Sequence, residues 1–167
     1  MTIAARRLHH NLSPLTAEER VTDTVWITTQ LSVEQRSALE QLLFFNVNQH
    51  RVRGGIQQSI DTYGVPEIYA RDGTLGIRVG AIAGVQSLFA VSTDGRPVGV
   101  AVFVRLAQDR VVVMHLGVEP DSQSGKDVNP SVLSRLLHAI RSTARCTRGI
   151  DRVELVYKNR PSMSLQG

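Results

Sequence analysis

The spacing of hydrophobic residues changes along the chain, and each change predicts a different structural element. Residues 25–27 read Val-Trp-Ile between threonines, a β-branched and aromatic composition that is typical of a β-strand. Ser32 and Gln35 have the spacing of a helix capping box. Hydrophobic residues then recur at helical spacing over 33–47, so the sequence predicts a helix there.

The next region is less regular. Residues 46–64 are polar with a Gly-Gly pair at 54–55, and we predict a short second helix at 56–63. The sequence Arg-Asp-Gly at 71–73 is a turn signal, and residues 75–79 after it predict a strand. No other element is predicted in this region.

Three strand patterns come next at short intervals, at 85–92, 98–106 and 111–118. Asp94-Gly95 between the first two is a strong signal for a two-residue hairpin turn, and the turn residues Ala-Gln-Asp-Arg at 107–110 separate the second from the third. Short turns join antiparallel neighbours, so the sequence predicts an antiparallel meander.

The third of these strands is almost entirely apolar, which predicts a central strand with helices on both of its faces. After a polar loop, Asn129-Pro130 has the pattern of an N-cap followed by proline at the first helical position. An amphipathic helix then runs to about Cys146, and a last strand is predicted at 153–157. Because a helix separates these two strands, we expect them to be parallel in a strand-helix-strand crossover.

These elements together predict the α/β (α+β) class, with a mixed and mostly antiparallel sheet of about five or six strands and helices on both faces. The length of 167 residues fits one domain, which we place at 23–167. The polar residues 1–22 before it are expected to form a flexible arm.

The composition indicates the cellular compartment of the protein and argues against metal and membrane binding. The single cysteine, Cys146, excludes an internal disulfide and multi-cysteine zinc sites, and it suits a reducing cytoplasm. The five histidines show no metal-ligand spacing, so no metal is expected. No apolar run is long enough to span a membrane, and residues 1–10 lack the apolar stretch of a signal peptide. We therefore expect a cytoplasmic protein without a membrane partner.

The charge favours an anionic partner. Nineteen Lys and Arg against 15 Asp and Glu give a net charge of +4. The arginines are scattered rather than gathered in one block, which argues against a dedicated nucleic-acid arm, and a phosphorylated small molecule explains the positive charge equally well. Nucleic-acid binding through four arginines of the last predicted helix and its end stays open as a weaker alternative: Arg135, Arg141, Arg145 and Arg148.

Two stretches resemble the Gcn5-related N-acetyltransferase (GNAT) superfamily. Residues 88–102 resemble the second hairpin of that family, and residues 115–120, His-Leu-Gly-Val-Glu-Pro, resemble the end of its fourth strand. The resemblance covers about residues 24–159. It implies a GNAT-like fold that binds acetyl-CoA and transfers its acetyl group to a primary amine by direct attack.

The resemblance also implies cofactor-binding residues. The family's fourth strand separates from its parallel neighbour and binds the pantetheine arm through backbone groups, which here are those of Leu116, Gly117 and Val118. The pyrophosphate-binding loop of the family corresponds to Gln123, Ser124, Gly125, Lys126, Asp127 and Val128. This loop departs from the family pattern, because Asp127 stands at the last small position. Asn159 matches an asparagine that contacts pantetheine.

Three residues are candidates for acid-base chemistry. His115 is the one ionisable side chain within 111–118, and the ordinary pKa of histidine suits a general base, although a histidine in an apolar strand also fits a hydrogen-bonded core position. Glu119 is a second candidate base, or a solvated loop carboxylate. Tyr157 would donate a proton to the departing thiolate, or pack at the end of the last strand. We interpret Cys146 as structural.

The resemblance therefore implies an acyl-CoA-dependent N-acyltransferase. The family continues past its fifth strand with a helix and two strands, whereas this sequence has residues 158–167 after that strand. Either a second copy completes the sheet in a homodimer, which we favour, or the acceptor pocket stays open. The altered loop and the short end leave an alternative, a non-catalytic GNAT-like domain that acts as a protein-interaction or regulatory module. The sequence does not name the acceptor amine.

Overall fold

The structure is a computed structural model that describes residues 25–46, 53–119, 130–156 and 163–164. The predicted arm at 1–22 lies outside the described residues. The elements, in chain order, are β1 (Trp26–Thr28), β2 (Leu31–Ser32), a 3₁₀ turn (Val33–Gln35), α1 (Arg36–Phe44), α2 (Arg53–Tyr63), β3 (Pro66–Arg71), β4 (Thr74–Val79), β5 (Gln86–Val91), β6 (Pro97–Ala107), β7 (Arg110–Val118), α3 (Pro130–Cys146), β8 (Arg152–Leu155) and β9 (Met163–Ser164).

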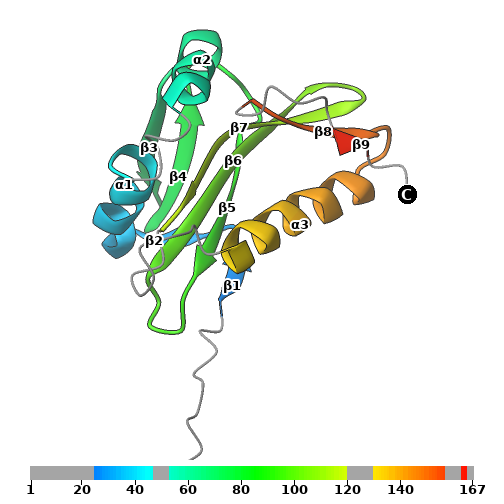
Figure 1. Cartoon of the computed structure of the whole chain (residues 1–167). Helices are drawn as coiled ribbons and strands as arrows, with labels where there is room; N and C mark the ends of the chain where they lie inside the picture. The colour runs from blue at the N-terminus through cyan, green and yellow to red at the C-terminus, as the bar shows by residue number, and fades with distance from the viewer. Residues whose placement is uncertain (1–24, 47–52, 120–129, 157–162, 165–167) are drawn as a thin grey trace, which may run out of the picture.

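The strands form two sheets. In the described part of the chain, six strands form one sheet in the order β1-β5-β6-β7-β8-β9, and a smaller sheet has the order β2-β4-β3. Paired strands are antiparallel except β7 and β8, which are parallel and connected through α3. This arrangement confirms the predicted class, the antiparallel meander of β5, β6 and β7, and the strand-helix-strand crossover (Figure 1).

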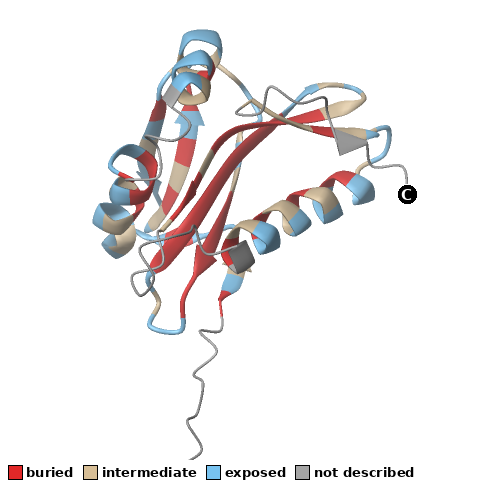
Figure 2. Ribbon diagram, in the orientation of Figure 1, coloured by how far each residue is buried: buried red, intermediate tan, exposed pale blue. Residues whose placement is uncertain are grey.

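The core lies on both faces of the larger sheet. β5, β6 and β7 are buried along most of their length (Figure 2). On one face, Leu136 and Ile140 of α3 pack among side chains of the sheet. On the other, Leu39 and Leu42 of α1 do so, and α2 contacts β7. Helices on both faces explain the nearly continuous apolar sequence of β7.

Two local sequence signals, the capping box before the first helix and the turn at residues 71–73, form as predicted. The Ser32 N–H donates to Gln35 Oε1 at 2.9 Å, and Ser32 Oγ accepts from the Glu34 N–H at 3.4 Å, which confirms the capping box. The helix starts as a 3₁₀ turn and ends at Phe44, earlier than the hydrophobic pattern predicts. Asp72-Gly73 joins β3 to β4 in a two-residue turn, where a positive φ at both positions suits the twist of a hairpin.

The structure differs from the sequence predictions at several points. β3 was not predicted, because most of its side chains are exposed and its hydrophobic signal is weak. It forms a hairpin with β4 that belongs to the separate small sheet. The turn between β5 and β6 has three residues rather than two, since the Ser92 N–H donates to Arg96 O across it at 2.9 Å. β8 ends at Leu155, and Tyr157 lies outside the described residues.

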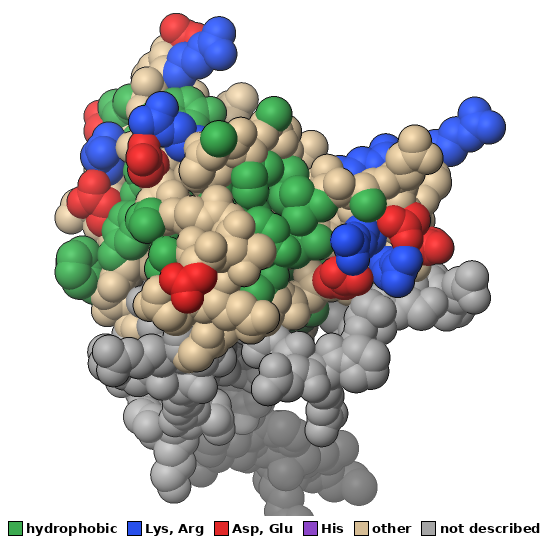
Figure 3. All heavy atoms as spheres, turned by 90° about the horizontal axis from the view of Figure 1, so that it is seen from above, with side chains coloured by type: hydrophobic (Ala, Val, Ile, Leu, Met, Phe, Trp, Pro, Cys, Tyr) green, Lys and Arg blue, Asp and Glu red, His purple; other side chains and the backbone are tan. Residues whose placement is uncertain are grey.

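The surface at one end of the molecule carries mixed charge. Viewed from above, hydrophobic side chains occupy the middle of this face, and positive and negative side chains lie next to each other on its flanks (Figure 3). The net charge of +4 is therefore not gathered into one positive patch on this face. In the part of the chain that the structure describes, no helix has the length and apolar character needed to cross a membrane.

Candidate functional site

The parallel strands β7 and β8 pair over part of β7 alone. Their pairing runs from Arg110 opposite Arg152 to Val113 opposite Leu155 and ends where the Val156 N–H donates to Val113 O at 3.3 Å. β7 continues to Val118. We call Met114–Val118 the open segment, because within the described residues no strand pairs with its β8 side.

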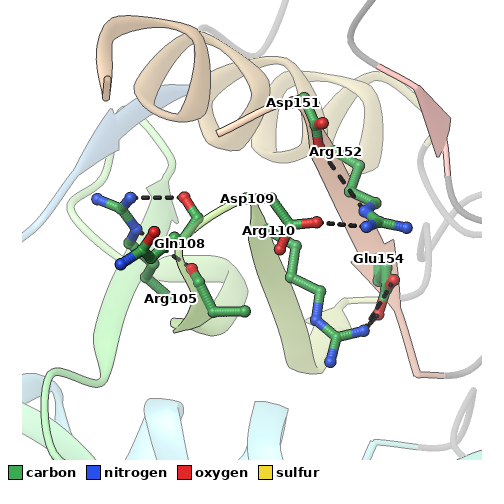
Figure 4. A network of polar contacts seen from close by, with 8 residues as sticks. Arg105, Gln108, Asp109, Arg110, Asp151, Arg152 and Glu154 are labelled. Carbon is green, nitrogen blue, oxygen red and sulfur yellow. Dashed lines mark hydrogen bonds and ion pairs between the residues drawn. The ribbon is translucent and has the colours of Figure 1, made fainter. Parts of the chain in front are cut away.

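Ion pairs connect β7 and β8 at the end where both strands begin, opposite the open segment (Figure 4). The Asp109 carboxylate accepts from Arg152 Nη2, and Asp109 O accepts from the Asp151 N–H at 2.9 Å. Arg110 donates to Glu154 at 3.3 Å. The Arg152 guanidinium holds the pKa of the Asp109 carboxyl below its ordinary value. β7 and β8 are thus held together where both begin, and their pairing ends at Val113 and Leu155, five residues before the end of β7 at Val118.

A β-bulge lies where the open segment begins. Val102 of β6 pairs with His115 and Phe103 pairs with Val113, so Met114 is an extra residue in β7. Successive residues of a strand turn their backbone N–H and C=O groups alternately to the two sides. The extra residue therefore shifts this alternation by one position throughout the open segment.

The bulge decides which backbone groups reach the open side of β7. The Glu119 N–H donates to Val98 O at 2.8 Å, so Glu119 and, by alternation, Gly117 turn their backbone groups toward β6. Leu116 and Val118 turn theirs the other way. Of the three backbone positions predicted to bind pantetheine, two therefore lie on the open side, and Gly117 pairs with β6.

Gly117 has a packing role instead. A Cβ atom at this position would lie 2.7 Å from Leu42 O of α1 and 3.3 Å from Val100 Cγ1. Glycine allows the helix backbone to approach the strand this closely because it has no side chain. The C-terminal end of α1 consequently lies directly against the open segment.

Two buried polar side chains from the helical region bind carbonyls of the open segment. Ser59 Oγ of α2 donates to Met114 O at 2.8 Å, and Asn46 Nδ2, just after α1, donates to Val118 O at 2.7 Å. Both side chains are buried. Sequence reasoning missed these two residues, because a serine or asparagine in a polar stretch carries no signal of a partner far along the chain.

His115 is buried within the open segment, with 6% of the residue exposed. Its cross-strand partner Val102 belongs to the core cluster on the α1 and α2 side of the sheet. Burial lowers the pKa of His115 to about 4, since a buried site disfavours the charged imidazolium. At neutral pH the side chain is therefore uncharged, and it is shielded from solvent.

We expect His115 to make the stability of the protein depend on pH. Its pKa is 6.5 in the unfolded chain and about 4 in the folded one, so the unfolded state binds the proton more readily between these values. Stability present above the unfolded pKa is therefore lost as the pH falls toward the folded one, by about 3 kcal/mol from this group. Denaturant unfolding at pH values from about 7 to about 4 should show a steeper loss for the wild type than for His115→Gln.

The exposed His138 of α3 provides the control for this prediction. His138→Gln should lose stability with falling pH as steeply as the wild type does. If the free energy of unfolding fell equally steeply with pH for the wild type and His115→Gln, burial of His115 would not be the cause of the loss of stability in acid.

Glu119 follows β7 at the same end of the strand. Its backbone is fixed by Val98, and its carboxylate forms an ion pair with Arg96 Nη1. The Glu119 side chain is 37% exposed, in contrast to the buried His115. Glu119 is therefore held in place and accessible to solvent.

The remaining predicted site residues lie outside the described part of the chain: Gln123, Ser124, Gly125, Lys126, Asp127, Val128, Tyr157 and Asn159. In the sequence, the loop residues among them separate the end of β7 at Val118 from the start of α3 at Pro130. The N-terminus of a helix such as α3 attracts anions through its unpaired backbone N–H groups. Within the described ranges, no three His, Cys, Asp or Glu side chains come together as a metal would require.

A separate groove of about 710 Å³ lies between β1 and α3. Val25 and Ile27 line one side of it, and Arg135, His138 and Arg141 are among the residues on the other. Arg135 Nη1 donates to Val25 O, so one of the four arginines considered for nucleic-acid binding has a partner within the fold. No residue of the open segment lines this groove.

Comparisons by sequence find no relative. No protein-family model matches the chain, and no curated protein matches it.

Three solved structures are similar to the chain. Nourseothricin acetyltransferase has a TM-score of 0.36 and 15% identity over 80% of this chain and 62% of its own. The GCN5-related glucosamine N-acetyltransferase region of a fungal multi-domain GH3 β-N-acetylglucosaminidase has a TM-score of 0.45 and 14% identity over 81% and 14%. A GNAT-family acetyltransferase from Staphylococcus aureus Mu50 has a TM-score of 0.42 and 11% identity over 79% and 73%. The chain spans less than two thirds of the length of the first two structures. Its fold class is established by the order and pairing of its own strands.

Proposed function

We propose that the chain is an acyl-CoA-dependent N-acyltransferase, with acetyl-CoA as donor and a primary amine as acceptor. The open segment carries this proposal, because it is a strand edge beside a parallel neighbour that ends earlier, next in sequence to the loop before α3. An extended ligand with amide groups pairs with such an edge as an added strand does. The resemblance of residues 115–120 to the fourth strand of the GNAT family supports the same function.

The open side of β7 fits the pantetheine arm of the donor. The arm is an extended chain that carries amide groups, and Leu116 and Val118 present backbone groups at the spacing of alternate strand residues. In this proposal residues 123–128 and the first N–H groups of α3 bind the pyrophosphate, with Lys126 offsetting the charge of Asp127. Asn159 contacts the arm, as the resemblance implies.

The chain's own groups then have defined tasks. The donor supplies an acetyl group as a thioester. The Leu116 N–H donates a hydrogen bond to the thioester oxygen, which stabilises negative charge there. Glu119 accepts the proton of the amine, because its carboxylate is accessible, whereas His115 is buried. Tyr157 provides the proton for the departing sulfur.

Thermal unfolding with and without acetyl-CoA tests the donor site. A ligand that binds the folded state alone adds about 2.7 kcal/mol at a hundredfold excess over its dissociation constant, so the wild type should unfold at a higher temperature with acetyl-CoA. Gly125→Glu places bulk and negative charge in the proposed pyrophosphate loop and should abolish the shift. Gly54→Glu is the matched control, because a side chain at Gly54 meets open space on α2.

The absence of a shift in the wild type at millimolar acetyl-CoA would overturn the proposal and favour the non-catalytic interaction module. A shift that persists unchanged in Gly125→Glu would place the donor elsewhere on the molecule. The acceptor amine, the homodimer and the cytoplasmic location stay predictions. Release of free CoA with a panel of primary amines, and sedimentation of the purified chain, would test the first two.

A further inference from the structure

The first and the last carbonyl of the open segment accept hydrogen bonds from side chains of the helical region. Ser59 reaches the first of them, Met114 O, from α2, and Asn46 reaches the last, Val118 O, from the end of α1. Ser59 is 0% exposed and Asn46 is 8% exposed. Where β8 no longer pairs with β7, these two side chains supply hydrogen bonds in its place.

The Ser59 bond is directed at the residue that forms the bulge. A bulge removes one residue from regular pairing, and a buried carbonyl without a partner costs free energy. Ser59 gives the Met114 carbonyl a partner outside the sheet, so the bulged arrangement is favoured over a regular ladder. In a regular ladder the alternation would turn the backbone groups of His115, instead of those of Leu116, to the open side.

The partner of Ser59 is unusual for a helical hydroxyl in this chain. Thr62 of the same helix donates to Gln58 O at 2.7 Å, and Thr143 of α3 donates to Ala139 O at 3.0 Å. Each of these threonines binds the carbonyl four residues earlier in its own helix, as hydroxyls in helices commonly do. The Ser59 hydroxyl instead donates to a carbonyl outside its own helix, Met114 O of β7, which gives it a specific role at that strand.

We propose that Ser59 and Asn46 are positioning residues that hold the open segment in the register that directs the Leu116 N–H to the open side. This inference rests on the proposed function, since the Leu116 N–H is the group assigned to the thioester oxygen. Ser59 sets the register by stabilising the bulge. Asn46 fixes the other end of the open segment by donating a hydrogen bond to Val118 O. The N–H and C=O of Leu116 and the N–H of Val118 stay directed to the open side.

Ser59→Ala, compared with Thr62→Ala, tests this inference. Both variants remove a hydroxyl from α2, but one of them alone removes a bond to β7. Calorimetric titration should show that Ser59→Ala binds acetyl-CoA about tenfold more weakly and binds CoA, which has no thioester oxygen, with a smaller change. A tenfold change corresponds to about 1.4 kcal/mol, within the range for one hydrogen bond. Thr62→Ala should bind both ligands as the wild type does.

Amide hydrogen exchange tests the register without any ligand. In the wild type the amides of His115 and Gly117 should be protected by pairing with β6, and the Leu116 amide should exchange faster. Ser59→Ala should reduce this contrast, and Thr62→Ala should keep it. If Ser59→Ala does not fold, Asn46→Asp replaces it, because the carboxylate keeps the size of the side chain and cannot donate to Val118 O.

The two proposals fail in different ways. Wild-type affinity for acetyl-CoA together with an unchanged exchange pattern in folded Ser59→Ala or Asn46→Asp would overturn the positioning role. A wild type that does not bind acetyl-CoA would overturn the proposed function and with it the link to a donor. The exchange pattern would then decide whether Ser59 holds the register of β7.

Discussion

Glu119→Gln should lower kcat for amine acetylation by about 100- to 10,000-fold, which is the usual contribution of a general base. Glutamine keeps the size of the side chain and can still contact Arg96, but it cannot take up the proton of the amine. Binding of acetyl-CoA should stay close to that of the wild type, because in this proposal Glu119 does not contact the donor. Steady-state kinetics with saturating donor, alongside calorimetric titration of acetyl-CoA, would separate the two effects.

Glu40→Gln is the matched control. Glu40 also pairs with an arginine, Arg36 at 2.9 Å, and its side chain is 40% exposed against 37% for Glu119. The substitution therefore removes one exposed carboxylate and one ion pair from α1, and kcat should not change. If Glu119→Gln kept wild-type kcat, the base would have to be another group, and His115→Gln would be measured next.

Gly117→Ala should lower the free energy of unfolding by about 1 to 3 kcal/mol, the usual cost of forcing an extra methyl group into a packed core. The new Cβ would lie 2.7 Å from Leu42 O, and a backbone atom cannot move aside as the end of a side chain can. The end of α1 would have to shift away from β7, which would also lengthen the bond from Asn46 to Val118 O. Urea unfolding would measure the loss.

The same substitution on α2 gives the opposite expectation. A Cβ at Gly54 meets nothing within 4 Å, and alanine favours the helix over glycine by up to about 1 kcal/mol. Gly54→Ala should therefore be neutral or stabilising. Equal stability of Gly117→Ala and the wild type would mean that α1 does not rest on the open segment as the structure has it.

Local patterns in the sequence were sufficient for much of the fold. The capping box at Ser32, the apolar run of β7, the start of α3 at Pro130 and the crossover to β8 depend on neighbours along the chain or on a simple periodicity. Hydrophobic spacing reports which side of an element is buried, so these elements could be predicted with nearly correct bounds. β3 could not, because most of its side chains remain exposed.

The candidate site depends on contacts between residues far apart in the chain. The sequence by itself directed attention to His115–Glu119, and the resemblance assigned the backbone of Leu116, Gly117 and Val118 to one task. The tertiary structure gives the backbone groups of these three residues different orientations, because the bulge at Met114 sets which of them face the open side. It also buried His115, which lowers its pKa, and left Glu119 accessible.

The sequence thus determined most of the elements and the mixed sheet, because these follow from local propensity and hydrophobic periodicity, and the resemblance of residues 115–120 pointed to the strand that carries the candidate site. The tertiary structure alone decided the register of that strand and its partners. Ser59 and Met114 are 55 positions apart, and Asn46 and Val118 are 72 apart. Hydrogen bonds over such separations depend on how the helices pack on the sheet, and no spacing rule within one element encodes them.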